Sequence, residues 1–206
     1  DYGASSVSGS SNMLDSFGYT FATDQNKLKR EFDEVGITFL HAPLFHPALA
    51  KVAPIRKGLA VKTFFNLMGP LVNPVQPNFQ NLGTYDIKTA RLYHYVMQNS
   101  GVQYSISTAL AGYDEISLTS PTKMYNNSGE FILESHDFGL TTLSPDDIKG
   151  GNSIEENSKI FLSVLDGTST KAQKDVVLAN TALALKTIYS TKDLIECVAI
   201  ANESLE

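Results

Sequence analysis

The alternation of apolar and polar positions predicts helices in the first part of the chain. Apolar residues recur at helical spacing between residues 24 and 35, and Gly36 follows where such a helix would stop. A shorter, serine-capped helix is expected to begin near residue 10. The apolar run at 37–40 favours a strand after the second helix.

Further along the chain, strand patterns alternate with helix patterns. Strands are expected at 81–85 and 102–110, with a helix between them that Asp86 caps. The turn residues Asn126-Asn127-Ser128-Gly129 lie between two apolar runs and predict a β-hairpin. Three helices are expected to close the chain, near 153–165, 170–189 and 191–204. This order is typical of an α/β fold with a mixed central sheet flanked by helices.

Composition restricts the classes of function. Of the 206 residues, 42% are apolar and 18% are charged, which is ordinary for a globular protein with one good core. The 16 Lys and Arg against 22 Asp and Glu give a formal charge of −6, which disfavours binding to a nucleic-acid backbone. No apolar run approaches the roughly 18 residues of a membrane span, so no membrane partner is expected.

The single cysteine and the first residues bear on the compartment. Cys197 has no cysteine to pair with in the chain and lies in an apolar run, where a buried thiol is the usual interpretation. This favours a reducing cytoplasm. The opening residues show no basic segment followed by an apolar one, so no secretory leader is expected. They also lack methionine, so residue 1 is not expected to start the gene product.

The serine-rich opening is the first candidate binding site. It contains Ser5, Ser6, Ser8 and Ser10, with Gly9 allowing close approach, just before a predicted helix, where free backbone N–H groups and the helix dipole favour an anion. An N-cap in a polar segment gives the same pattern. Taken alone, the pattern favours the N-cap.

The pair Asp114-Glu115 is the second candidate, because it follows a predicted strand. Adjacent carboxylates at the carboxyl end of a strand can hold Mg²⁺, whose other ligands are commonly water and phosphate. A solvated acidic loop is the alternative. The nearby Gly112 and the position at a sheet edge, where open α/β proteins bind ligands, strengthen the magnesium interpretation.

Arg56 is the third candidate, since a guanidinium group grips a carboxylate with two parallel hydrogen bonds. An ordinary surface arginine is the alternative. His46, before Pro47, either contacts a substrate or begins a helix. The remaining histidines show no metal-ligand spacing and are interpreted as structural or surface residues: His41, His94 and His136. No phosphate-binding Walker loop or nucleophile elbow occurs, so no covalent nucleophile is expected.

The order of these motifs resembles that of one enzyme family. The matching segments are Ser5-Ser6-Val7-Ser8-Gly9-Ser10-Ser11-Asn12, His46-Pro47-Ala48, Val52-Ala53-Pro54-Ile55-Arg56-Lys57, Thr63-Phe64-Phe65-Asn66-Leu67-Met68-Gly69-Pro70-Leu71-Val72-Asn73-Pro74, Gly112-Tyr113-Asp114-Glu115-Ile116-Ser117, Asp137-Phe138-Gly139-Leu140, and Gly150-Gly151 before Glu155-Glu156-Asn157. Over nearly its whole length the chain resembles the anthranilate phosphoribosyltransferases. These enzymes of tryptophan biosynthesis join the phosphoribosyl group of phosphoribosyl pyrophosphate to the amine of anthranilate.

The resemblance implies a fold, a cofactor and a set of site residues. The fold would be of the nucleoside phosphorylase/phosphoribosyltransferase type, and the cofactor Mg²⁺, bound by Asp114 and Glu115. Anthranilate would be contacted by Asp1, His46 and Arg56. Phosphoribosyl pyrophosphate would be bound by Asp1, Tyr2, Gly3, Ala4, Ser5, Ser6 and Ser10.

The resemblance also implies that part of the family's fold lies upstream of residue 1. The family's Gly-Thr-Gly-Gly-Asp loop and most of its helical N-terminal domain precede the position of Asp1. Residues 1–206 are therefore expected to form one incomplete α/β domain that lacks the helical domain, with residues 46–70 packing on it. The chain alone is expected to be inactive, and the full-length protein to be a cytoplasmic homodimer.

Three alternative interpretations of the function of the chain remain. A pyrimidine nucleoside phosphorylase resembles the family in fold and phosphate-binding serines, but the His-Pro and Asp-Glu motifs fit it less well. A non-catalytic, nucleic-acid-binding relative of the transferases conflicts with the net negative charge. A purely structural domain is the third alternative.

Overall fold

The computed structural model describes residues 9–45 and 67–206. The chain divides into two compact units. Unit 1 comprises residues 1–76 and 151–159, and unit 2 comprises residues 77–150 and 160–206.

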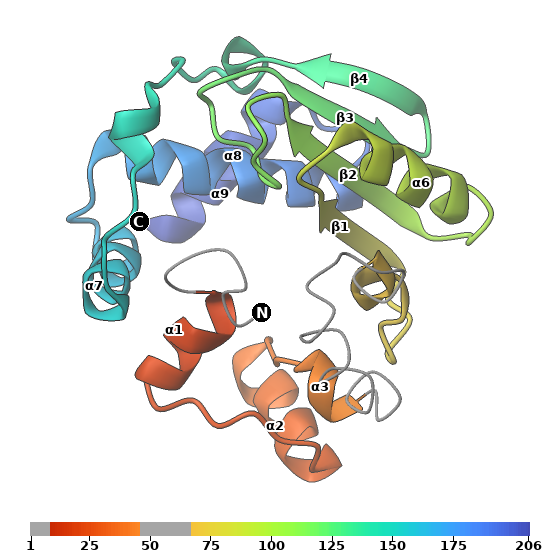
Figure 1. Cartoon of the computed structure of the whole chain (residues 1–206), viewed down its shortest axis with the longest axis vertical. Helices are drawn as coiled ribbons and strands as arrows, with labels where there is room; N and C mark the ends of the chain where they lie inside the picture. The colour runs from red at the N-terminus through yellow and green to blue at the C-terminus, as the bar shows by residue number, and fades with distance from the viewer. Residues whose placement is uncertain (1–8, 46–66) are drawn as a thin grey trace, which may run out of the picture. The chain divides into compact units, whose positions relative to one another are not determined.

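Unit 2 is built on a four-stranded mixed sheet with the strand order β1-β2-β3-β4 (Figure 1). The first two strands are parallel and are connected through helix α6, whereas β3 runs antiparallel to both β2 and β4. The elements are β1 (Phe79–Gly83), α6 (Ile87–Met97), β2 (Gln103–Ala109), β3 (Thr122–Asn126) and β4 (Gly129–Leu133). The expected α/β fold with a mixed sheet and one hairpin is confirmed.

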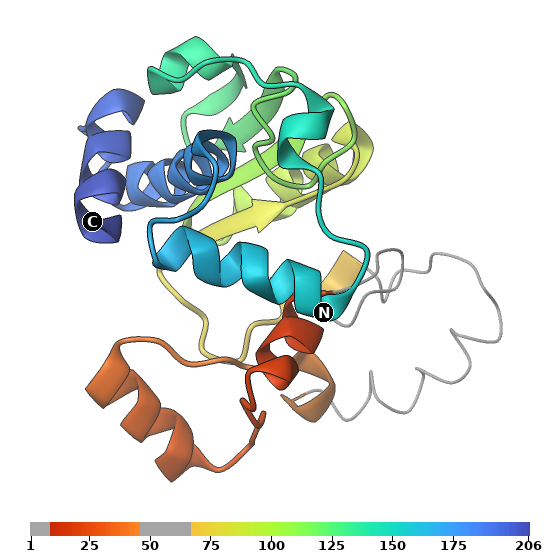
Figure 2. The ribbon, with the colours of Figure 1, turned by 90° about the vertical axis from the view of Figure 1, so that its left-hand side faces the viewer.

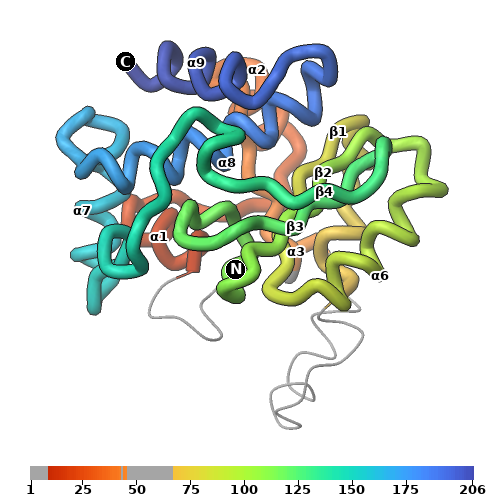
Figure 3. Tube along the Cα trace, turned by 90° about the horizontal axis from the view of Figure 1, so that it is seen from above, coloured from red at the N-terminus to blue at the C-terminus, as the bar shows by residue number. Residues whose placement is uncertain are grey.

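Helices cover the sheet of unit 2 on both faces. Successive side chains of a strand point to opposite faces. The Tyr104 hydroxyl lies 2.8 Å from Nδ1 of His94 on α6, whereas the Ser105 hydroxyl lies 2.7 Å from that of Thr187 on α8 (Lys171–Ile188). Figures 2 and 3 show α6 on one side of the sheet, and α8 with α9 (Leu194–Leu205) on the other. Strand β2 is therefore buried on both faces along most of its length.

One cluster of buried apolar residues in unit 2 lies on the α8 face of the sheet. It is formed by buried residues from β3, α8, α9 and the loops that follow β2 and β4: Ile116, Leu118, Met124, Phe138, Ala179, Ala182, Leu183 and Cys197. Cys197 has no exposed surface, which confirms its interpretation as a buried thiol.

The helices that end the chain begin and end close to their expected positions. α7 (Ile154–Leu165) is followed by Gly167, which adopts a left-handed conformation with φ of 72°. Side-chain caps begin the last two helices, Thr170 for α8 and Asp193 for α9. Short 3₁₀ turns at Ser135–Phe138 and Pro145–Ile148 connect β4 to this part of the chain. No helix within the described residues is long and apolar enough to cross a membrane.

Unit 1 contains short helices, α1 (Ser10–Ser16), α2 (Gln25–Val35) and α3 (Ala42–Phe45), and a 3₁₀ turn at Gly69–Leu71. α2 has the expected bounds, because the Asp24 carboxylate accepts hydrogen bonds from the first turn and Gly36 ends it with φ of 80°. The serine cap expected for α1 is wrong. Its N-cap is Gly9, whose N–H donates to Oδ1 of Asn12 at 3.1 Å.

The strand expected at 37–40 is also wrong, since these residues pair with no strand in the described part of the chain. Their side chains instead pack locally. The Phe39 ring lies edge-on to Tyr19 at 5.1 Å, and the Thr38 hydroxyl donates to Oε2 of Glu31 at 2.9 Å. An apolar run becomes a strand only where a neighbouring strand takes up its backbone groups.

Candidate functional site

The candidate site of unit 2 lies where β1 and β2 end. Because these strands are parallel, their carboxyl ends meet at one edge of the sheet, with Gly83 opposite Ser107. The Thr84 N–H continues the ladder by donating to the Ser107 carbonyl at 2.9 Å. Asp114 and Glu115 lie in the loop that follows β2, so they occupy the edge of the sheet where the sequence predicted them.

The two carboxylates of this loop are adjacent in the sequence and exposed. Neither side chain forms an ion pair with a Lys or Arg among the described residues. Partial loss of water around the Glu115 carboxyl group raises its pKa, and the charge of Asp114 raises it further. A cation at this position would relieve the repulsion between the two groups.

The donor set of the loop fits Mg²⁺ better than a metal held entirely by protein. Within residues 9–45 and 67–206, no three His, Cys, Asp or Glu side chains gather so as to hold a metal. Mg²⁺ commonly takes one or two carboxylates and completes its shell with water and substrate phosphates. Asp114 and Glu115 could therefore hold it together with a phosphorylated substrate, and this role stays a prediction.

A third carboxylate near this edge is already engaged. Asp86 follows β1 and caps α6, accepting hydrogen bonds from the Thr89 N–H at 2.9 Å and the Thr89 hydroxyl at 2.8 Å. Burial disfavours the charged form of Asp86 and by itself would raise the pKa of this carboxyl group. The hydrogen bonds that Asp86 accepts outweigh burial, so its pKa is lowered. Asp86 is therefore a structural cap, as the sequence predicted.

Two residues that the sequence analysis did not single out fix the loop of Asp114 and Glu115. A Cβ atom on Gly83 would overlap the Asp114 carbonyl oxygen, so only glycine lets the loop lie this close to β1. On the other side, the Asn180 side chain of α8 bonds both the N–H and the C=O of Ile116. Gly83, a glycine in the middle of the strand expected at 81–85, could have been noticed, whereas nothing near Asn180 in the sequence indicates this contact.

The predicted phosphate-binding residues belong to unit 1. Ser10 is the first residue of α1 and is exposed. Its neighbour Ser11 is buried, with its hydroxyl 3.4 Å from Nδ1 of His41. The other predicted substrate contacts lie outside the described residues: Asp1, Tyr2, Gly3, Ala4, Ser5, Ser6, His46 and Arg56. Their roles stay predictions.

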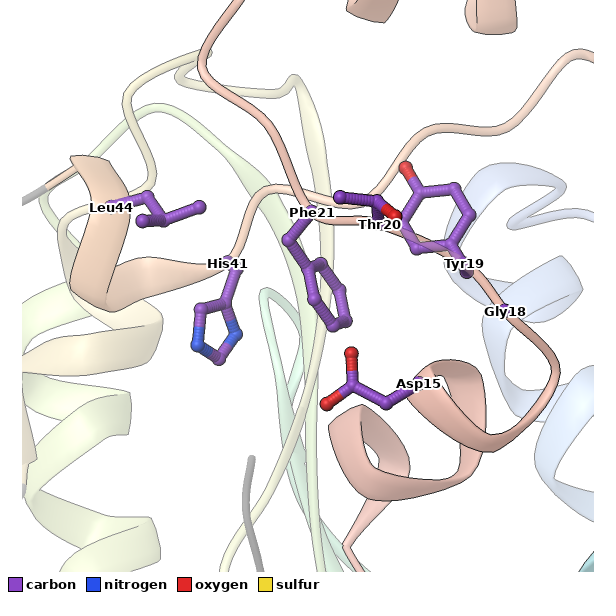
Figure 4. A pocket seen from close by; sticks show the side chains of 7 residues that line it. All are labelled: Asp15, Gly18, Tyr19, Thr20, Phe21, His41 and Leu44. Carbon is purple, nitrogen blue, oxygen red and sulfur yellow. The ribbon is translucent and has the colours of Figure 1, made fainter.

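Unit 1 also has a hollow of about 490 Å³ (Figure 4). Its described lining residues are Asp15, Gly18, Tyr19, Thr20, Phe21, His41 and Leu44. The His41 ring packs 4.7 Å from that of Phe21, and burial lowers the pKa of His41. Ser10 is not among the described residues that line this hollow, and no binding role was predicted for those that do.

Comparison with known proteins covers the whole chain. The family model described as glycosyl transferase family, a/b domain, matches residues 1–206. The anthranilate phosphoribosyltransferase of Bacteroides fragilis is 46% identical over 206 residues, which is 100% of this chain and 62% of that protein. The chain thus spans about 62% of the length of the curated relatives it matches.

Solved structures give the same match. The anthranilate phosphoribosyltransferase of Thermus thermophilus superposes with a TM-score of 0.90 at 29% identity, over 99% of this chain and 61% of that one. The Saccharomyces cerevisiae enzyme in complex with phosphoribosyl pyrophosphate and Mg also gives 0.90, at 27% identity, over 99% and 58%. The same yeast enzyme in complex with 4-fluoroanthranilate gives 0.86 at 27% identity, over 96% and 58%.

Proposed function

We propose that the protein containing this chain is an anthranilate phosphoribosyltransferase, on the premise that the chain belongs to the glycosyl transferase family and carries its a/b domain. The observation that carries the proposal is the 46% identity to the Bacteroides fragilis enzyme along all 206 residues. The reaction would transfer the phosphoribosyl group of phosphoribosyl pyrophosphate to the amine of anthranilate, as a step of tryptophan biosynthesis.

The chemistry of this transfer suits a site without a nucleophilic side chain. The aromatic amine attacks the anomeric carbon, the bond to pyrophosphate breaks, and the amine loses a proton. The protein's task is to align the two substrates and to neutralise the charge that develops on the leaving group. Alignment needs fixed polar groups, and neutralisation needs positive charge, which a cation held by Asp114 and Glu115 would supply.

Asp114 and Glu115 are the proposed ligands of Mg²⁺. Support comes from their exposure, their missing cationic partners among the described residues and their position after β2. Bound there, Mg²⁺ would supply positive charge to the pyrophosphate oxygens as the bond to the sugar breaks. The two carboxylates would fix the position of that charge, because their loop packs against Gly83 and is hydrogen-bonded to α8 at Ile116.

Substrate contacts are proposed for unit 1. Ser10 exposes its hydroxyl at the first residue of α1, where it can donate to a phosphate oxygen, and residues 1–6 would complete the phosphoribosyl pyrophosphate site. Arg56 would bind the anthranilate carboxylate through its two parallel donors, with His46 and Asp1 beside the ring. These assignments rest on the family motifs in the sequence.

The proposal extends to the cell and to assembly. A tryptophan-pathway enzyme would act in the cytoplasm, where its buried, unpaired Cys197 stays reduced. The full-length protein is proposed to be a homodimer that binds two small-molecule substrates and no nucleic acid, in keeping with a formal charge of −6.

A growth assay tests the proposed function. The full-length gene is expressed in a bacterial strain that lacks anthranilate phosphoribosyltransferase, on medium without tryptophan. We expect growth to be restored, and the purified protein to leave uridine and thymidine intact in the presence of phosphate. No growth from a well-expressed protein, or cleavage of either nucleoside, would contradict the proposal and favour a nucleoside phosphorylase.

A further inference from the structure

The loop that follows β2 is held at one buried residue. Asp114 and Glu115 are exposed, but the next residue, Ile116, is only 2% exposed and belongs to the core of unit 2. The loop begins with a tight turn in which the Ala109 N–H donates to the Tyr113 carbonyl at 2.9 Å. The two carboxylates therefore lie between a turn and a buried anchor.

Asn180 of α8 binds this anchor through both ends of its amide. The Ile116 N–H donates to Oδ1 of Asn180 at 2.9 Å, and Nδ2 of Asn180 donates to the Ile116 carbonyl at 2.8 Å. The same Nδ2 also donates to the Val176 carbonyl, one helical turn earlier, at 2.9 Å. Since this third bond fixes the rotation of the amide, Asn180 ties the loop to α8 in one orientation.

We propose that Asn180 is a positioning residue for the Mg²⁺ and pyrophosphate site of the proposed transferase. It touches neither substrate nor metal, and it acts by fixing the backbone that carries Asp114 and Glu115. The inference rests on the proposed function and adds to it a residue that determines how well the site binds its cation. Side chains that orient metal ligands typically contribute about 10- to 100-fold to metal affinity.

Gly83 supports the loop from the β1 side. Its position leaves no room for a Cβ atom against the Asp114 carbonyl, so β1 limits movement of the loop toward the sheet. The Ser107 hydroxyl of β2 points to the same carbonyl at 3.5 Å. The loop is thus confined by β1 and β2 at Asp114 and by α8 at Ile116. Functional groups need such support, because they must be held within about 0.5 Å of their productive geometry.

The chain offers a matched control at the other end of β2. The Asn127 side chain forms the same kind of clamp, accepting from the Tyr104 N–H at 2.9 Å and donating to the Val102 carbonyl at 2.8 Å. Both asparagines belong to unit 2, and each bonds one N–H and one C=O of the backbone beside β2, but Asn127 lies at the amino end of β2. Replacing either one removes a comparable clamp, and only Asn180 contacts the residue next to the carboxylates.

The experiment compares Asn180→Ala, Asn180→Ser and Asn127→Ala in the full-length protein. Serine at 180 can still bond the Val176 carbonyl but is too short to reach Ile116, so it keeps the helix while releasing the loop. Binding of Mn²⁺ in the presence of inorganic pyrophosphate is measured by electron paramagnetic resonance, and amide hydrogen exchange is followed over residues 110–118. The Mg²⁺ dependence of anthranilate consumption is the third readout.

We expect both Asn180 variants to exchange faster over 110–118 and to bind Mn²⁺ at least about tenfold more weakly. Asn127→Ala should leave Mn²⁺ affinity within about twofold of wild type, because its clamp lies away from the metal ligands. The Mg²⁺ concentration for half-maximal rate should rise in the Asn180 variants, with the KM for anthranilate unchanged.

Three results would overturn the inference. Unchanged Mn²⁺ affinity in both Asn180 variants would make Asn180 a purely structural residue, even with faster exchange in the loop. Equal losses in the Asn180 and Asn127 variants would point to general destabilisation. If wild type consumes anthranilate but binds no Mn²⁺ with pyrophosphate, the inference fails alone, whereas wild type without transferase activity contradicts the proposed function itself.

Discussion

At the residue scale, the position of the Asp114 and Glu115 carboxylates depends on neighbours that bear no charge. Gly83 provides the space under the loop, and Asn180 bonds both backbone groups of Ile116. Leaving a buried backbone group without a partner costs about 1 to 3 kcal/mol, so loss of the Asn180 amide would favour a different loop conformation. The acidic pair is useful to a cation only in the conformation that these contacts stabilise.

The charged groups of the site could be predicted from the sequence, but the residues that hold them in place could not. Asp114-Glu115 could be predicted because adjacent acids after a strand have a direct chemical use. Asn180 could not, since 64 positions separate it from Ile116 and a single asparagine in a helix carries no signal of its own. The contact arises only when α8 packs on the sheet.

A residue-scale prediction concerns Arg56, the proposed anthranilate contact. Arg56→Lys in the full-length protein keeps the charge but loses the planar pair of donors that grips a carboxylate. We expect the KM for anthranilate to rise by about tenfold or more, while the KM for phosphoribosyl pyrophosphate changes little. Steady-state kinetics with each substrate varied in turn measures both values. Equal increases in the two KM values would assign Arg56 a structural role.

At the scale of elements, side-chain caps account for most of the agreement between the sequence and the structure. Asp24, Asp86, Thr170 and Asp193 each begin the helix that follows them, and hairpin β3–β4 turns at the expected Asn-Ser pair. These features depend on residues near one another in the chain, so a local pattern predicts them. Residues 37–40 were predicted incorrectly because strand formation depends on a distant partner.

The Asp86 cap gives a prediction for helix α6. Asp86→Ala removes the acceptor for the Thr89 N–H and should lower the free energy of unfolding by about 1 kcal/mol at neutral pH. Urea denaturation followed by circular dichroism measures the change. A loss below about 0.3 kcal/mol would show that the cap contributes little to stability.

The Asp86 cap also makes the stability of the folded protein depend on pH. The pKa of Asp86 is lowered in the folded protein, so its charge stabilises the fold above the unfolded pKa of about 4, and this contribution is lost as pH falls through the folded pKa. Asp86→Asn keeps an acceptor without the charge. We expect wild type to be more stable than Asp86→Asn at neutral pH, with a smaller difference at pH 3. A difference that stayed constant with pH would contradict the assignment.

At the scale of the whole molecule, the chain spans about 62% of its curated relatives, so the proposed activity belongs to the longer protein. In the family that the sequence resembles, further substrate-binding motifs precede the position of Asp1. Misplacing a substrate by about 1 Å can cost on the order of a hundredfold in rate. A site that holds only part of its contacts should therefore lose nearly all of its turnover.

The 206-residue chain by itself is expected to fold without catalysing the transfer. We expect circular dichroism to show a folded α/β protein and an anthranilate assay to show no turnover. Activity should return only when the N-terminal part of the full-length protein is added. Enzyme-like turnover by the chain alone would show that residues 1–206 hold a complete site.

Loss of anthranilate fluorescence reports whether the Asp114-Glu115 loop supports phosphoribosyl transfer to anthranilate. Purified full-length wild type and the Asp114→Ala, Glu115→Ala double variant are compared with phosphoribosyl pyrophosphate at limiting Mg²⁺. We predict that wild type consumes anthranilate only when both Mg²⁺ and phosphoribosyl pyrophosphate are present. Loss of leaving-group neutralisation should slow the double variant by about 100-fold or more. Equal rates for the two proteins, or no consumption of anthranilate by wild type, would contradict a role of this loop in the transfer.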